Sequence, residues 1–183
     1  MTIDLTTKAL PDTVVVDGKA FLIKTDFRVW LKFERDLKAN LETQTDFDVS
    51  YIFVDEMPPY IDISILKEFE QPPRDLPRPI GTDRDYIPLD FDVDGGRIYS
   101  AFIQQYGINL LHTDMHWYEF LALLENISDE TLLGKVMGYR AYRKDTGNRK
   151  VDVREQLRRA WEIKPPISAE EQAEIDEFNS YFE

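Results

Sequence analysis

Two histidines with an aspartate between them form the most metal-like group in the sequence. His112 and His116 are four residues apart, and a helix through both would place their imidazoles on one face, as a metal site requires. The pattern instead predicts that a helix begins between them, and no third ligand is evident. We interpret both histidines as capping or core-edge residues. A metal-dependent enzyme that uses His112, Asp114 and His116 is kept as a remote alternative.

A run of aspartates reproduces the first half of a calcium-binding loop. Residues 90–95 read D-x-D-x-D-G. A complete loop needs an apolar residue at its eighth position and a bidentate glutamate at its twelfth, where this chain has Arg97 and Ala101. The simpler interpretation is an acidic first turn that complements a helix dipole. We predict no metal ion and no other cofactor.

The residue types that catalysis commonly uses are scarce. The chain has no cysteine, only those two histidines, and no phosphate-binding loop, nucleophile elbow or dinucleotide-binding glycine motif. Its 35 aspartates and glutamates make some pair of carboxylates inevitable, so a pair alone is weak evidence of acid–base chemistry. We therefore predict that the protein is not an enzyme.

Net charge and hydropathy restrict the class of partner. The formal net charge of −13 opposes binding to nucleic acid phosphates and favours solubility. No apolar stretch reaches the length of a membrane span, no targeting signal is visible, and the lack of cysteine fits a reducing compartment. We expect an intracellular protein that binds other proteins, with no nucleic acid and no membrane among its partners.

Charge is distributed unevenly along the chain. Residues 140–159 hold eight basic and three acidic residues, whereas residues 160–183 hold seven acidic residues and one lysine. The basic segment includes two candidate binding residues, Arg154 and Arg158. We expect this segment to dock on the acidic tail, either within one chain or between copies of a homo-oligomer.

The acidic tail has the pattern of an amphipathic helix. A capping box begins at Ser168, and Ile175, Phe178 and Phe182 follow at helical spacing. Three apolar side chains at i, i+3 and i+7 are typical of a helix that binds in a groove. We therefore include these three among the candidate binding residues.

Three charged residues lie within apolar faces of predicted helices. Glu34 and Lys38 are at i and i+4, which predicts either an ion pair at the rim of the face or a polar contact in an interface. Arg140 lies in the apolar arc of its helix, as expected of an arginine with a buried stem. All three are candidate binding residues.

The elements that must position these residues begin with a β-hairpin. Residues 13–24 contain β-branched and apolar runs on both sides of Asp17-Gly18, a dipeptide that favours a two-residue turn. A helix should follow at once, capped by Thr25 or Asp26. A hairpin this short needs a helix against which to pack.

The remainder is predicted to be helical around one long loop. Residues 49–54 fit either a strand or the start of a helix, and the proline-rich residues 71–90 predict an extended loop. Further helices are predicted at 61–70, from 92 to a stop at Gly107, at 114–126 after a cap at Thr113 or Asp114, from Ser128, and at 151–163.

Burial predictions follow from the apolar periodicity of the later helices. The helix from Ser128 should turn Leu132 inward, and the helix at 151–163 should do the same with Val153. Gly134 and Gly138 should admit a neighbouring backbone. The predicted fold class is mainly α with a small N-terminal β-hairpin, and α+β is the alternative. Residues 1–163 should form a single mostly helical domain, with residues 164–183 as an acidic helical tail.

Four motifs resemble a known family. They are TDFRVWLKFE at 25–34 after the hairpin, YSAFIQQYGI at 99–108, HWYEFLALL at 116–124, and GK at 134–135 with YR at 139–140. Across residues 13–38 and 90–142 the chain resembles the "gp fifteen" family of bacteriophages and prophages of Gram-positive bacteria. Members of that family lie in the tail module, between the major tail protein and the tape-measure protein.

The resemblance implies a tail assembly chaperone in the cytoplasm of the bacterial host. Such a protein would bind the tape-measure protein, with the major tail protein as a further candidate partner, until the tail tube displaces it. The family has no known catalytic residues to transfer. The alternative is a structural tail or neck component that is retained in the virion.

Overall fold

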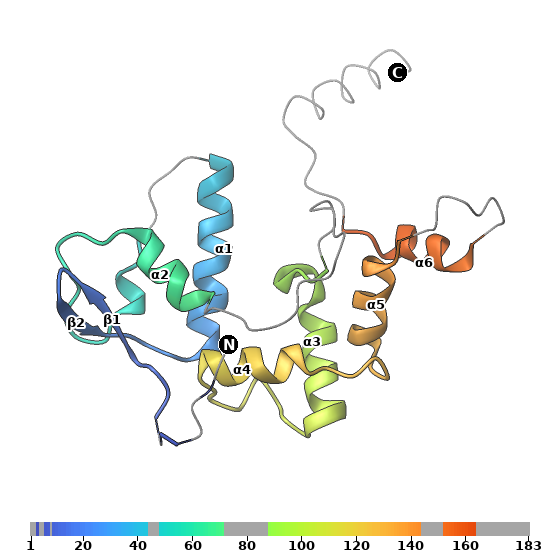
Figure 1. Cartoon of the computed structure of the whole chain (residues 1–183), viewed down its shortest axis with the longest axis horizontal. Coiled ribbons are helices and arrows are strands. Elements are labelled where there is room, and N and C mark those ends of the chain that lie inside the picture. Colours follow the sequence, from blue (N-terminus) through green and yellow to red (C-terminus); the bar gives the residue numbers. More distant parts are fainter. Residues whose placement is uncertain are drawn as a thin grey trace, which may run out of the picture. The chain divides into compact units, whose positions relative to one another are not determined.

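A computed structural model describes residues 3, 6–7, 9–43, 48–71, 88–143 and 152–163 (Figure 1). These residues are mainly helical with one small hairpin, which confirms the predicted fold class. The elements are β1 (Thr13–Val16), β2 (Lys19–Leu22), α1 (Phe27–Thr43), the 3₁₀ turn η1 (Ser50–Ile52), α2 (Ile63–Glu70), α3 (Phe91–Tyr106), α4 (Trp117–Glu125), α5 (Leu132–Ala141) and α6 (Val153–Trp161). Within the described ranges, no helix is long and apolar enough to cross a membrane.

The hairpin forms as its turn sequence predicts. β1 and β2 are antiparallel, and Val16 is paired with Lys19 across the two-residue turn. Asp17 and Gly18 both have positive φ, of 50° and 79°, as a tight hairpin turn requires. Val14, Val16 and Phe21 are buried, so one face of the hairpin packs into the core.

The helix after the hairpin begins where an aspartate satisfies its first turn. The Asp26 carboxylate accepts a hydrogen bond from the Arg28 backbone N–H at 3.0 Å, so Asp26 rather than Thr25 supplies this contact. Trp30 is fully buried, and its indole N–H donates to the Lys24 carbonyl at 3.0 Å. This bond joins α1 to the segment that follows β2.

Residues 48–71 form neither a long strand nor a long helix. The short turn η1 leads to Phe53, which bridges to Ile23 beside the hairpin. α2 begins at Ile63, where the Asp62 carboxylate accepts from the Ser64 N–H. The helix predicted at 61–70 is therefore confirmed. The predicted loop at 71–90 lies almost entirely outside the described residues.

α3 follows the predicted limits closely. It ends at Tyr106, and Gly107 follows with φ +68° and donates its N–H to the Ile103 carbonyl at 3.0 Å. This is the left-handed stop that glycine favours. Ile98 and Phe102 are buried, whereas Ile103 is exposed.

α4 begins later than predicted. The cap is His116, not Thr113 or Asp114: its Nδ1 accepts from the Tyr118 N–H, while Glu119 accepts from the His116 N–H. The reason is tertiary, because the backbone of 115–117 pairs with 25–27. The Phe27 N–H donates to the Met115 carbonyl, and this pairing holds the segment extended until Trp117.

α5 also begins later than predicted, at Leu132 rather than Ser128. Ser128 and Thr131 are both capping residue types, and it is the Thr131 hydroxyl that accepts from the Gly134 N–H at 3.0 Å. Leu132 is exposed and not inward as predicted, because it is the first residue of α5 and the buried face of the helix runs through Leu133, Val136 and Arg140. A side chain at Gly134 would meet the Ser128 carbonyl, as predicted for a close approach, whereas Gly138 has open space around it.

The chain forms two compact units, and the boundary falls inside α5. Unit 1 is Met1–Thr82 with Phe91–Lys135, and unit 2 is Asp83–Asp90 with Val136–Glu183. Within unit 1, Phe120 stacks on Phe27, Phe102 and Trp117 at centroid distances of 4.7, 5.3 and 5.6 Å. The predicted division at residue 163 stays a prediction.

In unit 2, α6 is amphipathic in sequence but has no fully buried residue among Val153–Trp161. Leu157 and Trp161 are half-buried. Val153, predicted to point inward, is exposed because it occupies the first position of the helix, one residue after the Asp152 cap. The helix at 151–163 is confirmed with slightly shorter ends.

Candidate protein-binding surfaces

Glu34 and Lys38 lie on α1 as predicted, one turn apart. Glu34 is half-buried and has one carboxylate oxygen shielded from solvent, and Lys38 is exposed. Their neighbour Phe33 is fully buried in the core of unit 1. The pair therefore lies at the edge of the core, and its role in binding stays a prediction.

Arg140 is buried within unit 2 and connects three of its segments by hydrogen bonds. Its side chain is buried, its Nε donates to the Trp161 carbonyl at 2.7 Å, and its Nη1 donates to the Pro88 carbonyl at 3.2 Å. These bonds join the end of α5 to the end of α6 and to the residues before α3. The predicted buried stem is confirmed, and a binding role for Arg140 stays a prediction.

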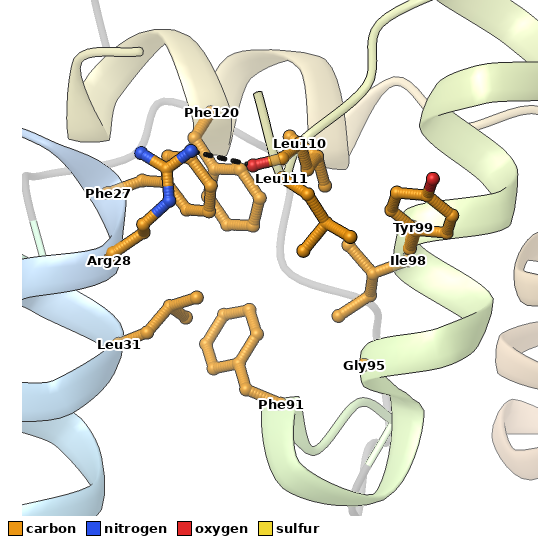
Figure 2. Close-up of a pocket in the computed structure, with 10 residues that line it drawn as sticks. All are labelled: Phe27, Arg28, Leu31, Phe91, Gly95, Ile98, Tyr99, Leu110, Leu111 and Phe120. Atoms are coloured by element: carbon orange, nitrogen blue, oxygen red, sulfur yellow. Dashed lines mark hydrogen bonds between the residues drawn. The ribbon is translucent and has the colours of Figure 1, made fainter. Parts of the chain in front are cut away.

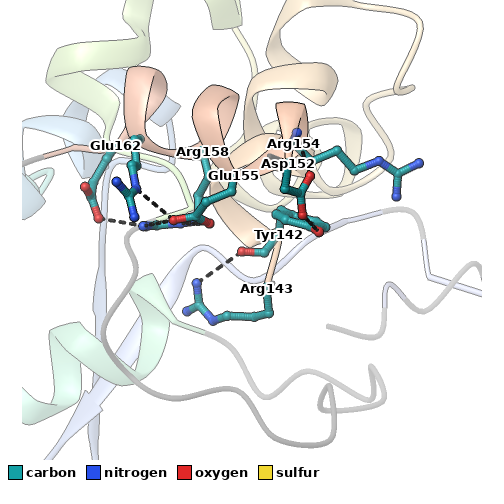
Figure 3. Close-up of polar contacts among 8 residues, drawn as sticks. Tyr142, Arg143, Asp152, Arg154, Glu155, Arg158 and Glu162 are labelled. Carbon is teal, nitrogen blue, oxygen red and sulfur yellow. Dashed lines mark hydrogen bonds and ion pairs between the residues drawn. The ribbon is translucent and has the colours of Figure 1, made fainter. Parts of the chain in front are cut away.

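An ion-pair network runs along α6 (Figure 3). Arg158 binds both oxygens of Glu155, at 2.9 and 3.0 Å, and reaches Glu162 at 2.9 Å. Arg159 donates to the same Glu155 at 2.9 Å. Hydrogen bonds from Arg158 and then Arg159 lower the pKa of Glu155 to about 2. Two of the basic charges on α6 are therefore neutralised by acids of the same helix.

The first turn of α6 is tied to the end of α5. The Asp152 carboxylate accepts from the Arg154 N–H at 3.0 Å, which caps α6, and also from the Tyr142 hydroxyl. The bond to Asp152 raises the pKa of Tyr142. The Arg154 guanidinium lies 6.0 Å from the centre of the Tyr142 ring. Arg154 and Arg158 thus share one helix, as predicted, but point to different partners (Figure 3).

The three tail residues predicted to bind in a groove, Ile175, Phe178 and Phe182, lie outside the described residues. Docking of the acidic tail on the basic segment, within or between chains, stays a prediction. What the structure adds is that Arg158 and Arg159 of the basic segment already have acidic partners in Glu155 and Glu162.

One of the two histidines, His116, uses its ring to bind the backbone of the fold. His116 accepts a hydrogen bond at Nδ1 from a backbone N–H, and its Nε2 lies 2.9 Å from the Pro11 carbonyl, which can only accept. Both ring nitrogens are therefore used, with the proton on Nε2. His112 is exposed, and Asp114 lies 3.5 Å from Arg28. Among the described residues, no three or more His, Asp or Glu side chains form a group that could hold a metal ion.

The calcium-like aspartates begin a helix instead of a loop. α3 starts at Phe91, so Asp92 and Asp94 lie in its first turn, where carboxylates complement the helix dipole. Arg35 donates to Asp92 at 2.6 Å, and Arg97 donates to the fully buried Asp94 at 2.9 Å. Two of the three carboxylates of this half-motif, those of Asp92 and Asp94, thus bind arginines.

An apolar cavity in unit 1 was not predicted from the sequence. Its volume is about 230 Å³, and side chains from α1, α3, α4 and the 110–111 turn surround it (Figure 2). The lining residues are Phe27, Arg28, Leu31, Phe91, Gly95, Ile98, Tyr99, Leu110, Leu111 and Phe120. Of these described residues only Arg28 is charged, and Leu111 is 70 % exposed at the edge.

Arg28 forms the polar corner of this cavity. Its Nη2 donates to the carbonyls of Leu110 and Thr113, at 2.8 and 3.0 Å, and its Nη1 donates to Asp26 at 2.8 Å. The guanidinium also lies 4.6 Å from the centre of the Phe27 ring. Arg28 thereby holds the 110–113 turn against α1 at one side of the cavity.

Gly95 of α3 lines the cavity at a point where no side chain fills the space. A side chain at Gly95 or at Gly96 would meet nothing within 4 Å, so the fold itself does not demand glycine at either position. Each glycine disfavours the helix by about 1 kcal/mol relative to alanine. Two features of the sequence could have indicated this surface. One is the adjacent glycine pair Gly95-Gly96 within a helix, and the other is the apolar pair Leu110-Leu111 outside any predicted helix or strand.

Comparison with known proteins identifies a family. A family model described as bacteriophage Gp15 protein matches residues 69–164, just over half of the chain. The match confirms the family resemblance over residues 90–142, and residues 13–38 lie outside the matched range. No curated protein and no solved structure was found to match the chain.

Proposed function

The chain belongs to the bacteriophage Gp15 protein family, and we propose that it is a tail assembly chaperone. The family indicates a phage structural or morphogenesis protein. The finer proposal is that this chain binds the tape-measure protein, and other copies of itself, during tail assembly, and that it does so without catalysis. The family membership is the observation that carries the proposal.

The charge and surface of the chain support a chaperone. A net charge of −13 keeps a complex with an aggregation-prone client soluble. The apolar cavity of unit 1 offers a place for client side chains, and the described part of the basic segment offers Arg154 beside exposed Val153. Weak contacts repeated over many copies would give avidity and still release the client as the tail tube grows.

The proposal also includes a cellular location and a role without metal chemistry. We place the protein in the cytoplasm of the bacterial host, where tails assemble, with no nucleic acid or membrane partner. The hydrogen bonds of His116 and the arginine partners of Asp92 and Asp94 support a role without metal chemistry. The major tail protein is a second candidate partner.

Co-expression with the tape-measure protein tests the proposal. We expect the tape-measure protein to become soluble and to co-purify with several copies of this chain, as measured by pull-down and light scattering. An unrelated acidic protein of similar size is the control for a general effect of charge. If the tape-measure protein stays insoluble while this chain runs alone, the chaperone proposal is wrong.

A structural tail or neck component is the alternative within the same family. The two roles differ in the fate of the protein, because a chaperone leaves and a structural component stays. Mass spectrometry of purified virions distinguishes them. Stoichiometric copies of this chain in virions would replace the chaperone proposal with the structural one.

A further inference from the structure

We infer that the cavity of unit 1 binds an amphipathic helix of a partner protein, through a bulky apolar side chain flanked by a lysine or arginine. The inference rests on the proposed function only for the identity of the partner. The chemical type of the ligand is inferred from the cavity, from the glycine in its wall and from the charges at its rim.

The size and lining of the cavity favour a side chain over a small molecule. Small-molecule sites are typically about 300–1,000 Å³ with several convergent polar groups, whereas this cavity is about 230 Å³. Its one charged side chain among the described lining residues, Arg28, already donates to two carbonyls and to Asp26. What is left is aromatic and aliphatic surface, which suits a leucine or phenylalanine side chain (Figure 2).

Gly95 leaves room for another backbone to come close to this wall. Glycine is a poor helix former, yet two stand together in α3, where the fold leaves room for a larger residue at both. Gly95 lines the cavity and Gly96 does not. An approaching helix would use the space that a side chain at residue 95 would fill.

The rim selects the charge of the partner. At the 110–114 end, the carboxylates of Asp26 and Asp114 both pair with the single guanidinium of Arg28, so this end has one excess negative charge. The Asp114 side chain is fully exposed. Beside Leu31 and Phe91, Arg35 is paired with Asp92, which leaves no surplus positive charge in that pair. A basic residue on the partner would meet Asp114, and a carboxylate would be repelled by it and by the net charge of −13.

A designed peptide tests this inference directly on the full chain. The probe is an alanine-based helical peptide with leucine at i, i+3 and i+7 and lysine at flanking positions. One control peptide replaces the lysines with glutamate, and a second replaces the leucines with serine. Affinity is measured by fluorescence anisotropy, and we expect the leucine–lysine peptide to bind at least tenfold more tightly than either control.

Two matched variants locate the site. G95L fills the cavity, while G96L adds the same side chain to the same helix one residue away. Both should raise the melting temperature similarly, but only G95L should weaken peptide binding, by at least tenfold. L111S, at an exposed rim position, should weaken binding without loss of folding. Equal binding to G95L and G96L, no binding to the unmodified chain, or a preference for the glutamate peptide would each overturn the inference.

The inference and the proposed function fail separately. If the peptide binds as expected but the unmodified chain does not solubilise the tape-measure protein, only the proposed function is wrong. If G95L solubilises the tape-measure protein as well as G96L and the peptide does not bind, only the inference is wrong. If G95L changes the self-association of the chain in light scattering and the peptide does not bind, the occupant is a second copy and the inference is overturned.

Discussion

Different forces stabilise the core of unit 1 and the helix α6 of unit 2. Trp30, Phe33, Phe102 and Phe120 of unit 1 are less than 2 % exposed and contact one another or further rings. The described residues of α6 include none that is buried, and the contacts of their charged side chains are mainly ion pairs and hydrogen bonds. Apolar burial involves no titrating group and is not screened by salt, whereas exposed ion pairs titrate with pH and are screened by salt. The two regions should therefore fail under different conditions.

The largest expected effect is the loss of an aromatic ring from the core of unit 1. F120A should lower the free energy of unfolding by about 3–5 kcal/mol, because it removes the ring on which Phe27, Phe102 and Trp117 stack. L157A on α6 should lower it by less than half as much, since Leu157 is only half-buried. Chemical denaturation measures both, and similar values would contradict the contrast.

Within unit 2, the largest effect should come from a polar residue. R140A would leave the carbonyls of Trp161 and Pro88 without their arginine donor, at a cost of about 1–3 kcal/mol. Amide hydrogen exchange should show faster opening of α6. R143A, which removes an exposed arginine just after α5, is the matched control and should leave exchange unchanged.

In unit 1, high pH should act through a half-buried tyrosine. Burial, and to a smaller extent Glu68, raises the pKa of Tyr118 to about 12. An unfolded tyrosine ionises near pH 10, so Tyr118 stabilises the fold below pH 10, and this contribution is lost as pH rises from about 10 to about 12. Denaturation midpoints across this range should fall less in Y118F than in the unmodified chain. Y60F, at an exposed tyrosine, should behave like the unmodified chain.

The smallest expected effect is acid fraying of α6. The pKa of Glu155 is lowered from 4.5 to about 2 by Arg158 and Arg159. Its contribution is therefore complete above pH 4.5 and is lost as pH falls toward 2. Site-specific amide exchange should show α6 opening over this interval, and high salt should weaken the effect. E155Q should abolish the pH dependence, whereas E130Q, in an exposed turn, should retain it; identical profiles would refute the role of the network.

Much of the fold was predictable because its signals are local. The hairpin was predicted from Asp17-Gly18, and the end of α3 from Gly107, since both sites need positive φ. The starts of α4 and α5 were predicted too early. In each case more than one capping residue type lies near the start of the helix, and for α4 the pairing of 115–117 with 25–27 favours the last of them, His116. The buried stem of Arg140 was predictable from its apolar neighbours, but its partner Trp161 was not, because the two lie 21 residues apart.

The sequence by itself determined the helical class, the hairpin, the family resemblance and the uneven charge. Turn dihedrals, apolar periods and net charge are properties of neighbouring residues, so they can be read along the chain. Only the tertiary structure decided that 115–117 pair with 25–27 and that Arg28 holds the 110–113 turn against α1. The cavity exists because Phe27, Gly95, Leu111 and Phe120 come from four separate segments, and no local pattern records the space between them.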